Sequence, residues 1–202
     1  MTTVTSICNK ALIKLGITKK ILNVETDDSP EANACSMVYD DILKEVLRVH
    51  NWNFAIFRQS LNKDNTTPVF GFNNRFILPT LPTFLRLLEI ENNPVFRLEN
   101  GYILSNENSI NIRFIGKETN PNKYDSIFIN LFACRIALEI GHSLTSDNGL
   151  IARIKQEYIE LLSLASEKDN LEDNDIAETA SSYNNSRITG LNIGITGNFI
   201  NS

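Results

Sequence analysis

The hydrophobic period of the chain changes twice, and this constrains the fold more than any other feature of the sequence. In residues 4–15 and 30–51, apolar residues recur at the three- and four-residue spacing of amphipathic helices. Between residues 53 and 116 apolar and polar residues alternate, as β-strands require. Helical spacing returns after Pro121 and continues to about residue 169. The sequence therefore predicts two helices, a β-rich insertion and two further helices.

Local signals place several element ends. Thr3 can cap the first helix and Gly16 can end it. Ser29 followed by Pro30 is a strong start for the second helix, because proline at the first helical position sacrifices no hydrogen bond. The Asn100-Gly101 pair lies between two short apolar runs and predicts a tight β-hairpin.

These patterns predict an α+β fold that is mainly α. We expect a four-helix bundle formed by residues 1–52 and 119–170, with a β-rich insertion at 53–118 between the second and third helices. The third helix is apolar almost all round, so we expect it to be central. Residues 171–202 are expected to form an acidic linker and an extended docking tail.

Composition excludes some classes of protein. The 202 residues carry a formal net charge of −5, which argues against a general nucleic-acid binder, since such proteins need a basic face. The sequence contains no run of 18 apolar residues, so it predicts no membrane span. Its N-terminus does not resemble a signal peptide. Three widely spaced cysteines, Cys8, Cys35 and Cys134, are expected to be buried thiols rather than disulfides or zinc ligands.

Candidate catalytic groups do not form a convincing set. Asp40 and Asp41 are adjacent on a predicted helix, so their side chains point about 100° apart and do not converge on one ion. His50 and His142 both fall at helix ends, where histidine commonly interacts with the terminal carbonyl groups. The glycines at 190, 194 and 197 have no lysine nearby and no helix after them, as a phosphate loop would need. We predict no enzyme activity, no catalytic or metal-binding residues and no cofactor.

Two features favour protein contacts. Trp52, Phe54, Phe57, Phe70, Phe72 and Phe76 form an aromatic group with too little positive charge around it for base stacking, which favours core or protein interface. Residues 167–178 have a net charge of −5, and a strand-like segment follows them. Such a segment can add a strand to a neighbour's sheet edge, although a disordered terminus is the alternative. The predicted docking residues are Leu191, Ile193, Ile195 and Phe199.

The order of several short motifs resembles a known family. These motifs are ICNKALIKLG at 7–16, SPEA at 29–32, DDIL at 40–43, WNFA at 52–55, Leu81-Pro82 and LRLL at 85–88. An aromatic-rich stretch from Pro121 to Phe132 then begins the third helix. In this order they resemble the head-to-tail adaptors of phages, which include the tail tubular protein A of short-tailed phages. The resemblance covers about residues 3–170.

The resemblance implies a structural role. Adaptors of this family look like a helical bundle with a β-rich part, have no catalytic residues, and form a ring under the portal protein that extends the DNA channel. We therefore expect a virion structural protein, a head-to-tail connector assembled in the host cytoplasm. Its expected partners are other copies of itself in a ring of twelve, the portal protein and the tail nozzle or tube protein. DNA would pass through without specific binding, and no membrane is involved.

In this hypothesis the helical bundles pack side by side through broad apolar faces, and the β insertion contacts the next tail component. The docking residues near the C-terminus would bind the portal or a neighbouring subunit. The alternative is a small monomeric or dimeric binding module with a regulatory or chaperone-like role.

Overall fold

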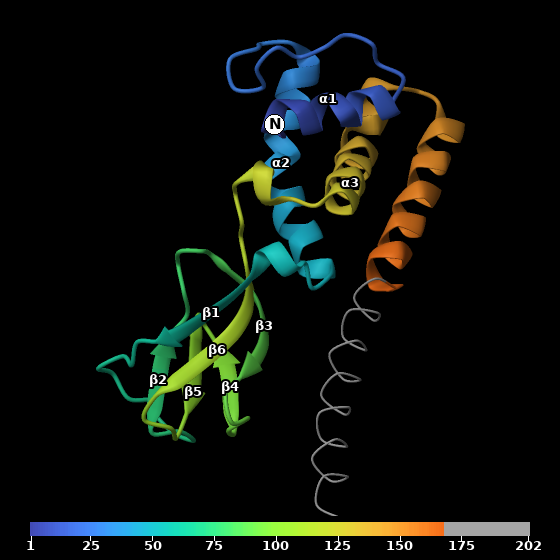
Figure 1. The fold of residues 1–202 in the computed structure, drawn as a ribbon. Helices are drawn as coiled ribbons and strands as arrows, with labels where there is room; N and C mark the ends of the chain where they lie inside the picture. Colours follow the sequence, from blue (N-terminus) through green and yellow to red (C-terminus); the bar gives the residue numbers. More distant parts are fainter. Residues whose placement is uncertain (168–202) are drawn as a thin grey trace, which may run out of the picture. The chain divides into compact units, whose positions relative to one another are not determined.

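The computed structural model describes residues 1–167 of the chain, and Met1–Ser163 form one compact unit. Its helices are α1 (Val4–Lys14), α2 (Pro30–Val49), α3 (Ser126–Leu144) and a further helix over residues 148–167. Its strands are β1 (Ile56–Leu61), β2 (Asn74–Ile77), β3 (Phe84–Ile90), β4 (Phe96–Glu99), β5 (Tyr102–Ser105) and β6 (Ile110–Gly116). All six strands lie in the segment 53–118 that is predicted to be β-rich (Figure 1).

The helix ends follow the local sequence. The Thr3 hydroxyl accepts a hydrogen bond from the backbone N–H of Ser6, whose side chain caps Thr3 in return. Ser29 caps α2 with Pro30 at its first position, and Gly16 adopts a φ of 75° just after α1. These predicted helix ends are confirmed. α2 ends at Val49.

α3 lies at the centre of the helical part. Phe128, Leu131, Phe132, Ile136 and other side chains on several of its faces are buried, and both α1 and α2 pack against it. Of the helices within residues 1–167, α3 alone is long and apolar enough to cross a membrane by length and composition. Its position between two other helices accounts for that composition, because a helix packed on several sides is apolar around most of its circumference.

The prediction of a mainly α fold built on a four-helix bundle is wrong. Residues 1–167 contain four helices and six strands in two antiparallel sheets, which is a mixed α+β fold. α1 is only 11 residues long and runs across α2 and α3 rather than alongside them (Figure 1). Within residues 148–163 the last helix buries only Ile154 fully, so it adds a narrow stripe rather than a fourth face of a shared core.

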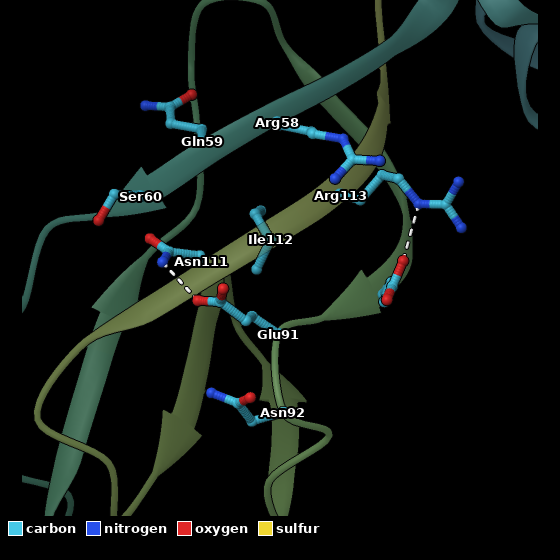
Figure 2. A pocket seen from close by; sticks show the side chains of 9 residues that line it. Arg58, Gln59, Ser60, Glu91, Asn92, Asn111, Ile112 and Arg113 are labelled. Carbon is cyan, nitrogen blue, oxygen red and sulfur yellow. Dashed lines mark hydrogen bonds and ion pairs between the residues drawn. The ribbon is translucent and has the colours of Figure 1, made fainter. Parts of the chain in front are cut away.

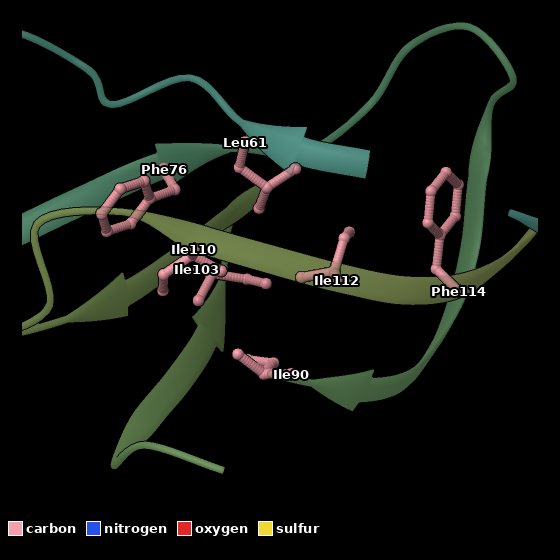
Figure 3. Close-up of a cluster of buried hydrophobic side chains, with 7 residues drawn as sticks. All are labelled: Leu61, Phe76, Ile90, Ile103, Ile110, Ile112 and Phe114. Atoms are coloured by element: carbon pink, nitrogen blue, oxygen red, sulfur yellow. The ribbon is translucent and has the colours of Figure 1, made fainter. Parts of the chain in front are cut away.

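The strands form two three-stranded sheets. Sheet A has the order β1-β6-β3 and sheet B has the order β2-β5-β4. A single bridge between Lys63 and Phe76 joins the extension of β1 to β2. Side chains from both sheets meet in one buried cluster (Figure 3). Its members are Leu61, Phe76, Ile90, Ile103, Ile110, Ile112 and Phe114.

The predicted hairpin at Asn100-Gly101 is confirmed. Asn100 and Gly101 have φ values of 46° and 81°, and they connect β4 to β5 with Glu99 opposite Tyr102. The two positive φ angles match the twist of the flanking strands, which is why Asn-Gly is favoured here.

Polar contacts join the helical part to sheet A. Arg48 near the end of α2 donates a hydrogen bond of 2.7 Å to the carbonyl oxygen of Leu85 on β3. Lys117, directly after β6, pairs with Asp40 of α2. Further along, the Tyr124 hydroxyl donates to the carbonyl oxygen of Glu118 at 2.9 Å. α2 is therefore tied to sheet A at β3 and again directly after β6.

Candidate interaction surface

The outer face of sheet B carries the side chains that do not enter the core. On β5, Ile103 and Ser105 point inward and are buried, whereas Tyr102 and Leu104 are half-buried on the opposite face. The register sets Arg97 of β4 and Arg75 of β2 on either side of Leu104. This face therefore combines an apolar centre with arginines on both flanking strands.

A loop of apolar residues borders this face. Val69 is 99% exposed and Phe70 is 86% exposed, and Val95 just before β4 is 80% exposed. Between the loop and the sheet lies a groove with a volume of about 670 Å³. We call it the apolar groove; its walls include Val69, Phe70, Val95, Arg97, Tyr102 and Leu104.

Hydrogen bonds hold both ends of the loop. Before it, the Asp64 backbone N–H donates to the carbonyl oxygen of Arg75 at 2.9 Å. After it, the Asn73 backbone N–H donates to the side-chain oxygen of Asn106 at 3.0 Å, and the Asn74 side chain donates to the carbonyl oxygen of Glu107 at 2.6 Å. The exposed valine and phenylalanine are thus presented by a loop anchored on β2.

Arg75 is fixed at one side of the apolar groove. Its guanidinium lies 4.5 Å from the centre of the Tyr102 ring, and its Nε donates to Asp64 at 2.5 Å. Desolvation acts to raise the pKa of the Asp64 carboxyl, but the hydrogen bond from Arg75 and backbone hydrogen bonds outweigh it and lower that pKa. The arginine charge is therefore balanced within the chain, and the groove remains mainly apolar.

The outer face of sheet A has a different character. Figure 2 shows a polar hollow of about 460 Å³ along β1, β6 and the end of β3. Arg113 Nε pairs with Glu89 at 2.9 Å, and the Asn111 side chain donates to Glu91 at 2.7 Å. Arg58 lies opposite Arg113 in the register. Glu89 of β3 lies on the other side of Arg113, so this face carries charged and polar side chains rather than an apolar centre.

The residues considered for catalysis are spread over the helical part. Asp40 pairs with Lys117 and Lys44, and Asp41 with Lys44. His50 caps the end of α2 with its ring 4.7 Å from that of Trp52. Within residues 1–167, no three His, Cys, Asp or Glu side chains gather as a metal site would require.

The three cysteines are buried free thiols, as predicted. Cys8 and Cys35 share a hydrogen bond, which together with burial raises the pKa of the Cys8 thiol. A thiol of this kind stays protonated and unreactive.

The aromatic group divides between core and surface. Trp52 and Phe54 pack against Phe128 of α3 at ring distances of 5.0 and 4.9 Å. Phe76 is fully buried between the sheets, whereas Phe70 is exposed. Sequence reasoning assigned the group to core or interface without separating its members; the core assignment is confirmed for Trp52 and Phe76, and an interface role for Phe70 stays a prediction. Sequence reasoning also missed Val69 and Val95, whose only signal is an apolar side chain inside a loop rich in Asn, Pro and Gly.

The predicted docking residues Leu191, Ile193, Ile195 and Phe199 lie outside the described residues. No protein-family model matches the chain, and no curated protein matches it either.

Proposed function

We propose that this chain is a virion structural protein, a head-to-tail connector whose copies form a ring between the portal vertex and the tail. The observation that carries this proposal is the apolar groove with its exposed loop. The order of motifs over residues 3–170, which resembles phage adaptors, supports the specific assembly. The proposed partners are other copies of the chain, the portal protein and the next tail component.

The exposed apolar residues favour a role in assembly. Val69, Phe70 and Val95 lie on one part of the molecule and are backed by Tyr102 and Leu104. Gathered apolar side chains of this kind on a protein surface mark sites of protein contact more often than scattered ones do. Aromatic residues are also enriched in the buried centres of such contacts. The loop that bears Phe70 is therefore the best candidate for a contact with a partner chain.

In this proposal the helices of neighbouring copies do not pack side by side through broad apolar faces, as the sequence hypothesis expects. α2 buries Cys35, Leu43, Val46 and Leu47 inside the chain. The apolar faces of α3 likewise pack against α1 and α2. In the proposal the helices therefore form the rigid body of each subunit, and the β-rich part supplies the principal contact surface.

The electrostatics are compatible with a channel for DNA. The chain has a net charge of −5, and on the outer face of sheet A Arg113 is paired with Glu89. Tight binding of a duplex requires many lysine or arginine contacts with phosphates that are not neutralised by nearby acids. A connector of this composition would let DNA slide past.

The test is to mix the full chain with portal rings from the same genome and to image the mixture by electron microscopy. We expect an additional ring on the portal. A Val69→Ser variant should give fewer such rings, whereas Met37→Ser is the matched control, because Met37 is also largely exposed, at 79% against 99% for Val69, but lies on α2.

Portal rings that remain bare with the unaltered chain would contradict the proposal. If the chain then stayed monomeric or dimeric and bound a soluble protein, the alternative role as a small binding module would replace it.

A further inference from the structure

We infer that the strand-like segment at 191–199 of one copy adds to the free edge of β4 in a neighbouring copy and fills its apolar groove. This deepens the proposed function, on which it rests, by naming the surface that receives the docking residues.

The first observation is the free edge itself. β4 is the last strand of sheet B, and β5 is its one strand neighbour within residues 1–167. Glu99 and Tyr102 flank a two-residue hairpin loop, so they form a hydrogen-bonded pair, and so do Arg97 and Leu104 two residues away. By the same alternation, the backbone groups of Phe96 and Leu98 point away from β5. They are available to one further strand.

The second observation is that the groove begins at this edge. Arg97 lies on β4, and Val95 directly precedes this strand. Both line the groove together with Phe70. A strand added to β4 would place every second side chain on this outer face. Backbone pairing and apolar pockets at alternate positions are the two parts of recognition by strand addition.

The third observation is the chemistry of the segment. Leu191, Ile193 and Ile195 alternate with Asn192 and Gly194, so their side chains would share one face of a strand. From residue 188 to residue 202 the sequence has no charged side chain. The segment can therefore be buried in an apolar groove without the cost of removing a charge from water.

The length of intervening chain allows a contact between copies. Residues 168–190 separate the described part from the segment. Fully extended, these 23 residues would span up to about 75 Å, at about 3.3 Å per residue. A compact domain of this size has a radius of gyration of only about 15 Å. In a ring, the neighbour's groove is thus within reach, and each copy would hold the next.

Cross-linking tests this arrangement in the full chain. Arg97 faces the groove, and its pairing with β5 makes it the close-approach position toward an added strand, where a disulfide fits best. One chain carries Arg97→Cys, and a second chain, with a tag that changes its mass, carries Ile193→Cys. The native cysteines are fully buried and do not compete. Under mild oxidation we expect a product with one chain of each kind.

The matched control replaces Arg97→Cys by Arg58→Cys, an exposed arginine on the outer face of β1. This pair should give at least tenfold less mixed product. Equal yields from both pairs, or no mixed product from either, would overturn the inference.

A chain that carries both Arg97→Cys and Ile193→Cys distinguishes the source of the segment. Linkage only within single chains would show that the groove takes the chain's own segment, and this also contradicts the inference. The mass of the same samples without oxidation reports ring formation separately. Rings without the cross-link would refute the docking surface alone, and the cross-link without rings would refute the connector.

Discussion

Replacing either of two phenylalanines six positions apart should have opposite consequences for stability and assembly. Phe76 is fully buried between the two sheets, and Phe70 is 86% exposed. For Phe76→Ala, removal of a buried aromatic ring and the cavity that remains should lower the free energy of unfolding by about 3–5 kcal/mol. For Phe70→Ala the loss should be much smaller, because most of the ring is already in water.

The size of the smaller effect follows from area. A phenylalanine side chain presents about 200 Å². If about 14% of it is buried in the single chain, about 28 Å² is lost, which corresponds to about 0.7 kcal/mol at about 25 cal/mol per Å². Urea unfolding followed by circular dichroism resolves the two cases. With an m-value of about 2 kcal/mol per M, the midpoint should fall by about 1.5–2.5 M for Phe76→Ala and by about 0.4 M for Phe70→Ala.

Assembly must be separated from folding in this comparison, because association stabilises the folded state by mass action. The unfolding curves are therefore measured at chain concentrations at which the native mass is that of a monomer. At higher concentration, Phe70→Ala should reduce assembly while its unfolding stays close to that of the unaltered chain. A loss above about 2 kcal/mol for Phe70→Ala would refute the reasoning, since a loss of that size requires a packed ring.

Four further substitutions test the fold. Gly116→Ala should lower the free energy of unfolding by about 1–3 kcal/mol, because the added Cβ would lie 2.8 Å from a ring carbon of Phe57; urea midpoints measure this. Gly101→Ala should cost about 1–2 kcal/mol, because its φ is 81°, whereas Asn100→Gly keeps the turn and should be nearly neutral. Hydrogen bonds from Lys117 and then Lys44 lower the pKa of Asp40 below its ordinary 3.8. Its stabilisation is therefore complete well above pH 3.8 and is lost as the pH falls through the lower folded-state pKa. Asp40→Asn should be less stable by about 1 kcal/mol or less near neutral pH, because the side chain is half exposed, and the difference should vanish in acid.

Local features of the fold were predictable because their physical causes are local. The capping of α1 by Thr3, the Ser29-Pro30 start of α2 and the Asn100-Gly101 turn each depend on a few adjacent residues. The branched and aromatic run Phe84–Ile90 also predicts a strand, and β3 has these bounds. The alternation predicted from residue 53 starts before β1, because Asn53–Ala55 form a 3₁₀ turn ahead of the strand.

Features that depend on distant parts of the chain were not predictable in the same way. β6 pairs with both β1 and β3. The alternation of apolar residues along a strand predicts which face is buried but not which strands are its neighbours. The prediction of a four-helix bundle was wrong for the same reason, because the periodicity of α1 indicates its apolar face but not its angle to α2 and α3. The apolar groove exists only once the loop around Phe70 is anchored on β2. The predicted docking residues near the C-terminus lie outside the described residues and stay a prediction.

The native mass of the full-length chain, alone and with portal rings from the same genome, tests the central proposal most directly. The account predicts a species of about twelve chains of 22.8 kDa each in at least one of the two samples. It further predicts that Val69→Ser reduces this species and that Met37→Ser preserves it. A chain that stays monomeric or dimeric in both samples would contradict the connector proposal.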